Sequence, residues 1–174
     1  MIIATVLTLS GCAMPNIVTD ARNASIRNAA KAFSEAVDCF GKLQITKGED
    51  LDALARQNGL CGDWLTLGAT DEELAVWSWT LGNDTALIRI DESTGVPIIK
   101  VLTAGQGRAN AWTQWEDHTL IACWQVRLDL SGKKPEVTEF ECPQQWLESW
   151  GAAEVMTLKE LKEAAEELGV AVIA

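Results

Sequence analysis

Residues 119–130, TLIACWQVRLDL, carry the clearest secondary-structure signal in this chain. Side chains alternate between the two faces of a β-strand, so the strict alternation of these residues predicts a half-buried antiparallel strand. Its predicted core face comprises Leu120, Ala122, Trp124, Val126, Leu128 and Leu130. Trp124, in the middle of that face, is therefore expected in the core.

Helices are predicted before this strand. Over residues 19–43, apolar side chains recur at the three- and four-residue spacing of one helix face. A shorter helix is expected over 49–58, which gives an N-terminal helical hairpin. Further strands are predicted over 74–81, 85–90, 96–103 and 136–141, with Gly82-Asn83-Asp84 as a hairpin turn. The intervening residues 104–110, AGQGRAN, are expected to form a glycine-containing loop.

The chain is expected to return to helix after the strands. Pro143 opens a short helix with Trp146 and Trp150. Thr157-Leu158-Lys159-Glu160 has the pattern of a capping box before a C-terminal helix that ends at Gly169. N-terminal helices, an antiparallel sheet of about five strands and C-terminal helices predict an α+β fold, with residues 13–174 as a single domain.

Charge and composition exclude several functional classes. The chain has 174 residues, with 25 acidic against 14 basic side chains and a net charge of −11. Nucleic acid is not expected as a partner, because phosphate binding needs clustered Lys and Arg. With one histidine and no closely spaced cysteine pair, neither a metal site nor a cofactor is expected.

The N-terminal residues 1–12, MIIATVLTLSGC, are apolar and end on Leu9-Ser10-Gly11-Cys12. This stretch resembles the lipobox of bacterial lipoproteins, in which the cysteine is lipidated and becomes the mature N-terminus. The resemblance implies lipidation at Cys12 and a lipid-anchored protein of the bacterial cell envelope, outside the cytoplasm. The alternative is an apolar strand or helix with a core cysteine. Without a functional lipobox, an exported chain would be secreted.

The remaining four cysteines form an even set, and four cysteines allow three pairings. Cys39 ends one predicted helix and Cys61 follows the next, so a Cys39–Cys61 disulfide would join the helical hairpin. Cys123 and Cys142 flank the turn residues 131–135, so a Cys123–Cys142 disulfide would join two strands. Disulfides form in oxidising compartments, which agrees with export. Reduced core cysteines are the alternative.

One group of residues has the composition of a catalytic site. Glu116 could orient the imidazole of His118, and a nearby Ser or Thr could then act as nucleophile. An exposed polar turn is the favoured interpretation of these residues, because a lone histidine lacks the third group that a working site needs. Enzymatic activity is therefore not the favoured function.

Eight tryptophans and no tyrosine make up an unusual aromatic content. Most large apolar side chains are buried, so core packing is the favoured role for the set. Trp112 and Trp115, next to the expected loop, are the best candidates for an exposed surface that binds a protein or a glycan.

Three functions remain in competition. The first is a cell-envelope lipoprotein with a non-catalytic binding or structural domain, bound to the membrane through its N-terminal lipid. The second is a pilin-like subunit of a surface assembly. An apolar start that continues through Pro15-Asn16-Ile17 into a long helix, followed by an antiparallel sheet with a late disulfide, is loosely similar to pilins, although their Gly-Phe processing site is absent. The third is a secreted hydrolase that uses Glu116 and His118.

Overall fold

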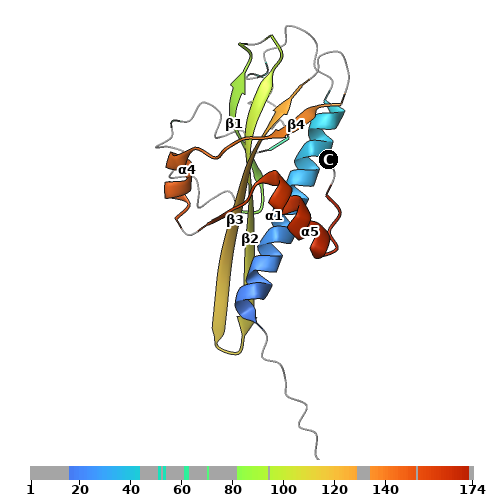
Figure 1. The fold of residues 1–174 in the computed structure, drawn as a ribbon. Coiled ribbons are helices and arrows are strands. Elements are labelled where there is room, and N and C mark those ends of the chain that lie inside the picture. The colour runs from blue at the N-terminus through green and yellow to red at the C-terminus, as the bar shows by residue number, and fades with distance from the viewer. Residues whose placement is uncertain are drawn as a thin grey trace, which may run out of the picture.

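The structure, a computed structural model, describes residues 16–43, 82–93, 95–128, 134–151 and 153–172, together with residues 51, 53, 61, 62 and 70. The described elements confirm the α+β class (Figure 1). In chain order they are α1 (Ile17–Lys42), β1 (Thr85–Asp91), β2 (Ile98–Ala111), β3 (Gln114–Arg127), β4 (Glu136–Glu139), α4 (Gln144–Ser149), β5 (Glu154–Val155) and α5 (Leu158–Glu167).

A five-stranded sheet is the centre of the fold. Its order is β1-β2-β3-β4 with every neighbouring pair antiparallel, and the two residues of β5 pair with β3 in parallel. Strands β2 and β3 form a long hairpin that pairs without interruption from Ile98↔Arg127 to Ala111↔Gln114. The expected loop at 104–110 is therefore wrong, because these residues lie within β2. Strand β3 also begins at Gln114, earlier than the predicted start at 119.

Two expected elements cannot be compared with the structure. The strand over 74–81 and most of the second helix over 49–58 lie outside the described residues, although Leu51 and Ala53 are helical. The other predicted elements are present with shifted ends. Strand β1 matches the prediction, and α4 and α5 are the predicted C-terminal helices.

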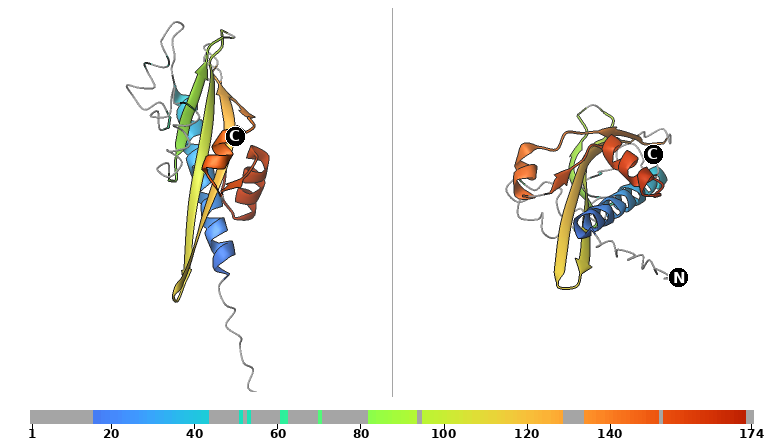
Figure 2. Two further views of the ribbon diagram at one scale, coloured as in Figure 1. Left: turned by 90° about the vertical axis from the view of Figure 1, so that its left-hand side faces the viewer. Right: turned by 60° about the horizontal axis from the view of Figure 1, so that its bottom comes forward.

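Helix α1 covers one face of the sheet along the β2–β3 hairpin, with α5 beside it (Figure 2). The rings of Phe33 and Phe40 meet Trp124 edge-on, with centroids 5.0 and 6.0 Å apart. Trp124 is fully buried, as predicted, and its indole Nε1 donates to Thr103 Oγ1 at 2.9 Å. Thr103 Oγ1 lies 3.1 Å from Thr85 Oγ1, which donates to the Ala32 carbonyl. The polar atoms of this core are thus paired, and their hydrogen bonds offset the cost of removing them from water.

The opposite face of the sheet is also covered at its centre. Ile121 and Cys123, the outward residues of the predicted half-buried strand, are buried. They pack with Ile88 and Leu102 under the segment that contains α4, including Phe140, Leu147 and Trp150. The prediction of a half-buried strand is therefore wrong for the middle of β3, because residues 140–151 fold back over that face.

Two glycines allow α1 to approach β2 closely. A Cβ atom on Gly107 would lie 1.9 Å from the Ala21 carbonyl oxygen, and one on Gly105 would lie 2.2 Å from the Ser25 carbonyl oxygen. Their helical partners Ala21, Ser25 and Ala29 are small and one turn apart, so helix and strand touch backbone to backbone. Gly105-Gln106-Gly107 is thus a helix-packing site within a strand.

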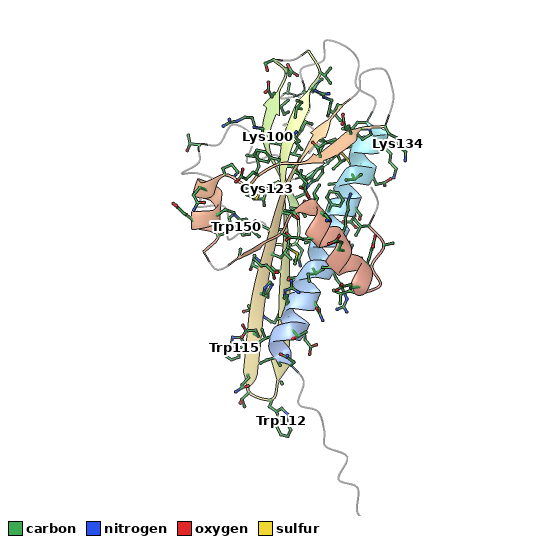
Figure 3. All side chains as sticks on the ribbon, in the orientation of Figure 1. Lys100, Trp112, Trp115, Cys123, Lys134 and Trp150 are labelled. Atoms are coloured by element: carbon green, nitrogen blue, oxygen red, sulfur yellow. A yellow bond between two sulfur atoms is a disulfide. The ribbon has the colours of Figure 1, made fainter. Side chains whose placement is uncertain are left out.

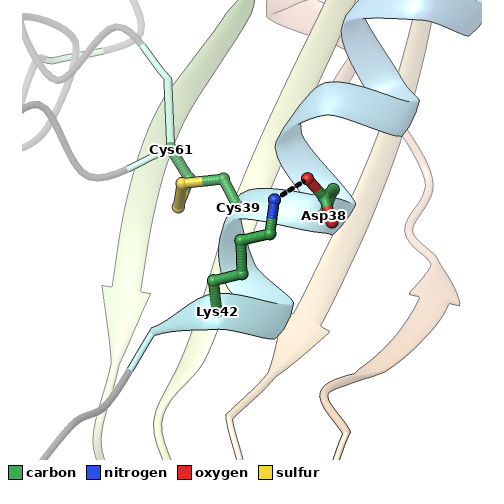
Figure 4. Close-up of a disulfide and its surroundings, with 4 residues drawn as sticks. All are labelled: Asp38, Cys39, Lys42 and Cys61. Carbon is green, nitrogen blue, oxygen red and sulfur yellow. Dashed lines mark hydrogen bonds and ion pairs between the residues drawn. A yellow bond between two sulfur atoms is a disulfide. The ribbon is translucent and has the colours of Figure 1, made fainter.

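Both predicted disulfides are present. Cys39 on α1 is bonded to Cys61, next to the Asp38–Lys42 ion pair (Figure 4). Cys123 on β3 is bonded to Cys142, which holds the segment after β4 onto the sheet. Disulfides indicate an oxidising, extracytoplasmic compartment. Among the described helices, none is both long and apolar enough to cross a membrane.

Candidate functional site

The far end of the β2–β3 hairpin carries the most exposed aromatic residues in the described part of the chain. Trp112 is 101% exposed and Trp115 is 71% exposed, so their predicted exposure is confirmed. Figure 3 places both rings at the end where α1 begins, pointing into solvent. Burial of an indole is favourable, so two uncovered rings at one end of the hairpin indicate a contact surface.

The turn itself is conformationally unusual. Trp112 and Thr113 form a two-residue loop between paired Ala111 and Gln114, and Trp112 has a φ of +59°. Tight hairpin turns need positive φ, which Gly, Asn and Asp adopt most easily. A tryptophan there costs of order 1–3 kcal/mol, and such strain gathers at functional positions. Trp112 and Trp115 are together called the hairpin tip below.

A hollow lies further along the hairpin, on the face turned away from α1. It encloses about 490 Å³, within the range of small-molecule sites. Gln106, Arg108, Asp117 and Thr119 line it from the two strands, and Trp150 lines it from the segment after α4. A half-buried indole among polar side chains offers both a stacking surface and hydrogen-bond partners.

The two charged side chains of the hollow neutralise each other. Arg108 donates from Nε and Nη2 to the two carboxylate oxygens of Asp117, at 2.5 and 3.1 Å. These hydrogen bonds hold the pKa of Asp117 below its usual range and raise the pKa of Arg108. The pair is solvent-exposed, so it adds little to stability, but it leaves the hollow without net charge.

His118 lies in a polar network on the other face of the hairpin, against α1. Ser25 Oγ lies 2.8 Å from His118 Nδ1, and His118 Nε2 lies 3.1 Å from Glu154 Oε2. Arg22 donates to both oxygens of Glu154 at 2.8 and 2.6 Å, and this contact raises the pKa of Arg22. The network joins α1, β3 and β5.

A serine, a histidine and a carboxylate in contact resemble a hydrolase triad, but the serine is not placed to act as a nucleophile. The Ser25 hydroxyl lies 2.7 Å from the Arg22 carbonyl, a backbone acceptor that competes with His118 Nδ1 for its proton. A nucleophile needs a base that takes that proton. Ser25 is also fully buried against Gly105 and Gly107, where no substrate reaches it. The network therefore fastens α1 to the sheet.

The two proposed catalytic residues, Glu116 and His118, both lie in β3. Glu116 pairs with Ala109 in the hairpin, and the carboxylate that contacts His118 is Glu154. The favoured alternative, an exposed polar turn over residues 116–118, is wrong, because these residues lie within β3. Cys12, the predicted lipidation site, lies outside the described residues. No cluster of metal-ligating side chains occurs within the described ranges.

Two features of the site were missed at the sequence level. Arg108 precedes the turn residues Trp112-Thr113 by as many positions as Asp117 follows them. In a hairpin with that turn, residues so placed face each other across the two strands. The Arg108–Asp117 pair was not predicted because residues 104–110 were expected to form a loop. Trp150 and Glu154 reach the hairpin only through tertiary folding, and no local pattern marks them.

Comparisons with protein-family models, with curated proteins and with solved structures found no match.

Proposed function

We propose that this chain is a lipid-anchored protein of the bacterial cell envelope, with a globular domain that binds a ligand and does not catalyse a reaction. The main structural support for this proposal is the presence of both disulfides, Cys39–Cys61 and Cys123–Cys142. They support an oxidising compartment independently of the lipobox-like Leu9-Ser10-Gly11-Cys12. Lipidation at Cys12 would then hold the domain at the membrane.

The hollow lined by Arg108, Asp117 and Trp150 is the proposed ligand site. Its charges are paired, so it favours a neutral ligand over an ionic one. Gln106 and Thr119 add hydrogen-bonding groups beside the indole of Trp150. A glycan has both hydroxyl groups and an apolar ring face, so it fits this combination of side chains.

Detergent partitioning and mass spectrometry test the anchor. The full chain, expressed in a bacterium that processes lipoproteins, is expected to enter the detergent phase and to carry acyl groups on Cys12. Cys12→Ser should remain in the aqueous phase. A Cys12→Ser variant that still partitions into detergent contradicts the anchor.

Titration of the folded protein with envelope glycan fragments tests the ligand site. Tryptophan emission is expected to change on binding, and Trp150→Ala should weaken the affinity at least tenfold, about 1.4 kcal/mol. Trp112→Ala is the matched control, because its indole lies outside the hollow and should leave this affinity unchanged. Equal loss in both variants would argue against the hollow.

A pilin-like subunit remains the second candidate. One long helix lying along an antiparallel sheet is the layout on which that resemblance rests. The same mass spectrum separates the two candidates, since a mature N-terminus at an acylated Cys12 contradicts a pilin.

A further inference from the structure

The hairpin tip and the start of α1 lie at the same end of the molecule (Figure 1). Ala21 of α1 contacts Gly107 of β2, and the helix runs toward its N-terminus as β2 runs toward the tip. Measured from this Ala21–Gly107 contact, Trp112 is five residues further along the strand, or about 16 Å at about 3.3 Å per residue. Ile17 lies about 6 Å further along the helix at about 1.5 Å per residue. The helix thus begins about 10 Å short of the level of the tip.

Cys12 can reach the level of the tip. It precedes Ile17 by five residues, and an extended chain of that length spans at most about 17 Å. This length exceeds the difference of about 10 Å between the start of α1 and Trp112. A lipid on Cys12 would therefore leave enough chain for the tip to meet the membrane surface.

Apolar side chains are concentrated at this end. Within the described residues, four large apolar side chains are exposed, and three of them are Val18 in the first turn of α1, Trp112 and Trp115. The fourth, Val155, lies in β5. The exposed apolar surface therefore faces the side from which the chain would leave for its anchor.

The charge of this end suits a lipid headgroup layer. Residues 109–115, ANAWTQW, contain no charge in a protein whose net charge is −11. The nearest basic side chain in the hairpin, Arg108, is already paired with Asp117. Anionic lipid would repel the acidic remainder of the molecule, whereas a neutral indole prefers the boundary between water and hydrocarbon.

We propose that Trp112 and Trp115 insert into the headgroup layer of the membrane that carries the Cys12 lipid. The inference rests on the proposed lipid anchor and adds an orientation to it. The hairpin stands on the bilayer with the fully exposed ring of Trp112 facing it, and the hollow beside Trp150 stays in solvent above the surface. A second point of contact would stop the domain from turning freely about a single tether.

Fluorescence quenching by brominated lipid tests this contact in the full-length acylated protein. The protein is reconstituted into phosphatidylcholine vesicles with either ordinary acyl chains or chains brominated near the headgroup. Brominated lipid should remove up to about a quarter of the emission, because the tip holds two of the eight tryptophans. Trp112→Phe/Trp115→Phe keeps the apolar surface and should abolish the quenching.

Trp150→Phe is the matched control and should retain the full quenching. Mass spectrometry of the same sample reports acylation of Cys12. Acylated protein without quenching overturns the membrane contact and leaves the anchor intact. A response to added glycan or protein that is lost in Trp112→Phe/Trp115→Phe but kept in Trp150→Phe assigns the tip to that partner instead. Absence of the acyl groups overturns both proposals.

Discussion

At the scale of single residues, the absence of a side chain determines how the helix meets the sheet. Gly105 and Gly107 stand where any Cβ would overlap the backbone of α1. Backbone atoms cannot move aside as the end of a flexible side chain can. The only way to accept a methyl group is to shift the helix, which disturbs the packing of Phe33 and Phe40 on Trp124.

Gly107→Ala is therefore expected to destabilise the protein by about 3 kcal/mol or more. Urea denaturation monitored by circular dichroism measures the change. Gly41→Ala is the matched control, because nothing lies within 4 Å of the added Cβ and the residue sits in α1. Alanine is the better helix former, so this control should gain about 0.5–1 kcal/mol. A Gly107→Ala variant as stable as the wild type would contradict the close contact.

Ser25→Ala tests whether the polar network is structural. The substitution removes the hydroxyl that links His118 Nδ1 to the Arg22 carbonyl, and the stranded groups should cost about 1–3 kcal/mol in the free energy of unfolding. Thr113→Ala, at an exposed position, is the control and should lower the free energy of unfolding much less than Ser25→Ala does. Hydrolase assays on both variants complete the test, because an activity lost in Ser25→Ala at unchanged stability would restore the catalytic interpretation.

At the scale of elements, α5 shows local rules working as expected. Thr157 Oγ1 accepts from the Glu160 backbone N–H, and the Glu160 carboxylate accepts from the Thr157 backbone N–H and hydroxyl. The predicted capping box is confirmed. Thr157→Ala should cost about 1 kcal/mol, measured by thermal or urea unfolding. The exposed Thr113→Ala serves again as a reference.

The same capping box has a pH dependence. The hydrogen bonds from Thr157 lower the pKa of Glu160 in the folded protein. A carboxyl whose folded pKa is lowered stabilises the fold above its unfolded pKa, and this contribution is lost as the pH falls through the folded value. Glu160→Gln should therefore be less stable than the wild type at neutral pH, with the difference shrinking in acid. A difference that grows on acidification would contradict the capping role.

The β2–β3 hairpin shows where sequence rules failed at this scale. Glycine indicates a loop when only local conformation is considered, so residues 104–110 were expected to interrupt the strand. In the fold, Gly105 and Gly107 are needed because α1 passes over them, and this contact joins residues about 80 positions apart. Local propensity contains no information about such a contact.

At the scale of the whole molecule, the Cys123–Cys142 disulfide joins the sheet to the segment that follows β4. Cys142 lies beyond the end of β4, and its bond to Cys123 secures the segment that covers the outer face of the sheet. Cys123→Ser/Cys142→Ser should cost about 3 kcal/mol in the chain-entropy account of a loop this long.

Removal of the Cys123–Cys142 disulfide should also disturb the hollow, because Trp150 follows Cys142 on the same segment. Cys39→Ser/Cys61→Ser should lower the stability by a similar amount, because the Cys39–Cys61 disulfide closes a loop of similar length. The sequence separation is 22 for this disulfide and 19 for Cys123–Cys142. It is the matched control, because this disulfide lies away from the hollow. Chemical denaturation and proteolysis after residue 142 distinguish the two, and equal protease sensitivity would contradict the fastening role.

The sequence by itself determined the features that depend on short-range patterns. Periodicity identified α1, the strand around Trp124 and the α+β class, and the four-residue signature of α5 identified its cap. Spacing about a helix end and a turn favoured the observed cysteine pairs. These features follow from backbone geometry and local hydrogen bonds, which a window of a few residues contains.

Only the tertiary structure decided which contacts the β2–β3 hairpin makes with the rest of the molecule. It turned a presumed glycine loop into a helix-packing site, replaced Glu116 by Glu154 as the partner of His118, and covered the outward face of β3. It also placed Trp112 and Trp115 at the end where α1 begins. Each of these depends on contacts between residues far apart in the chain, and such contacts are fixed by the packing of whole elements.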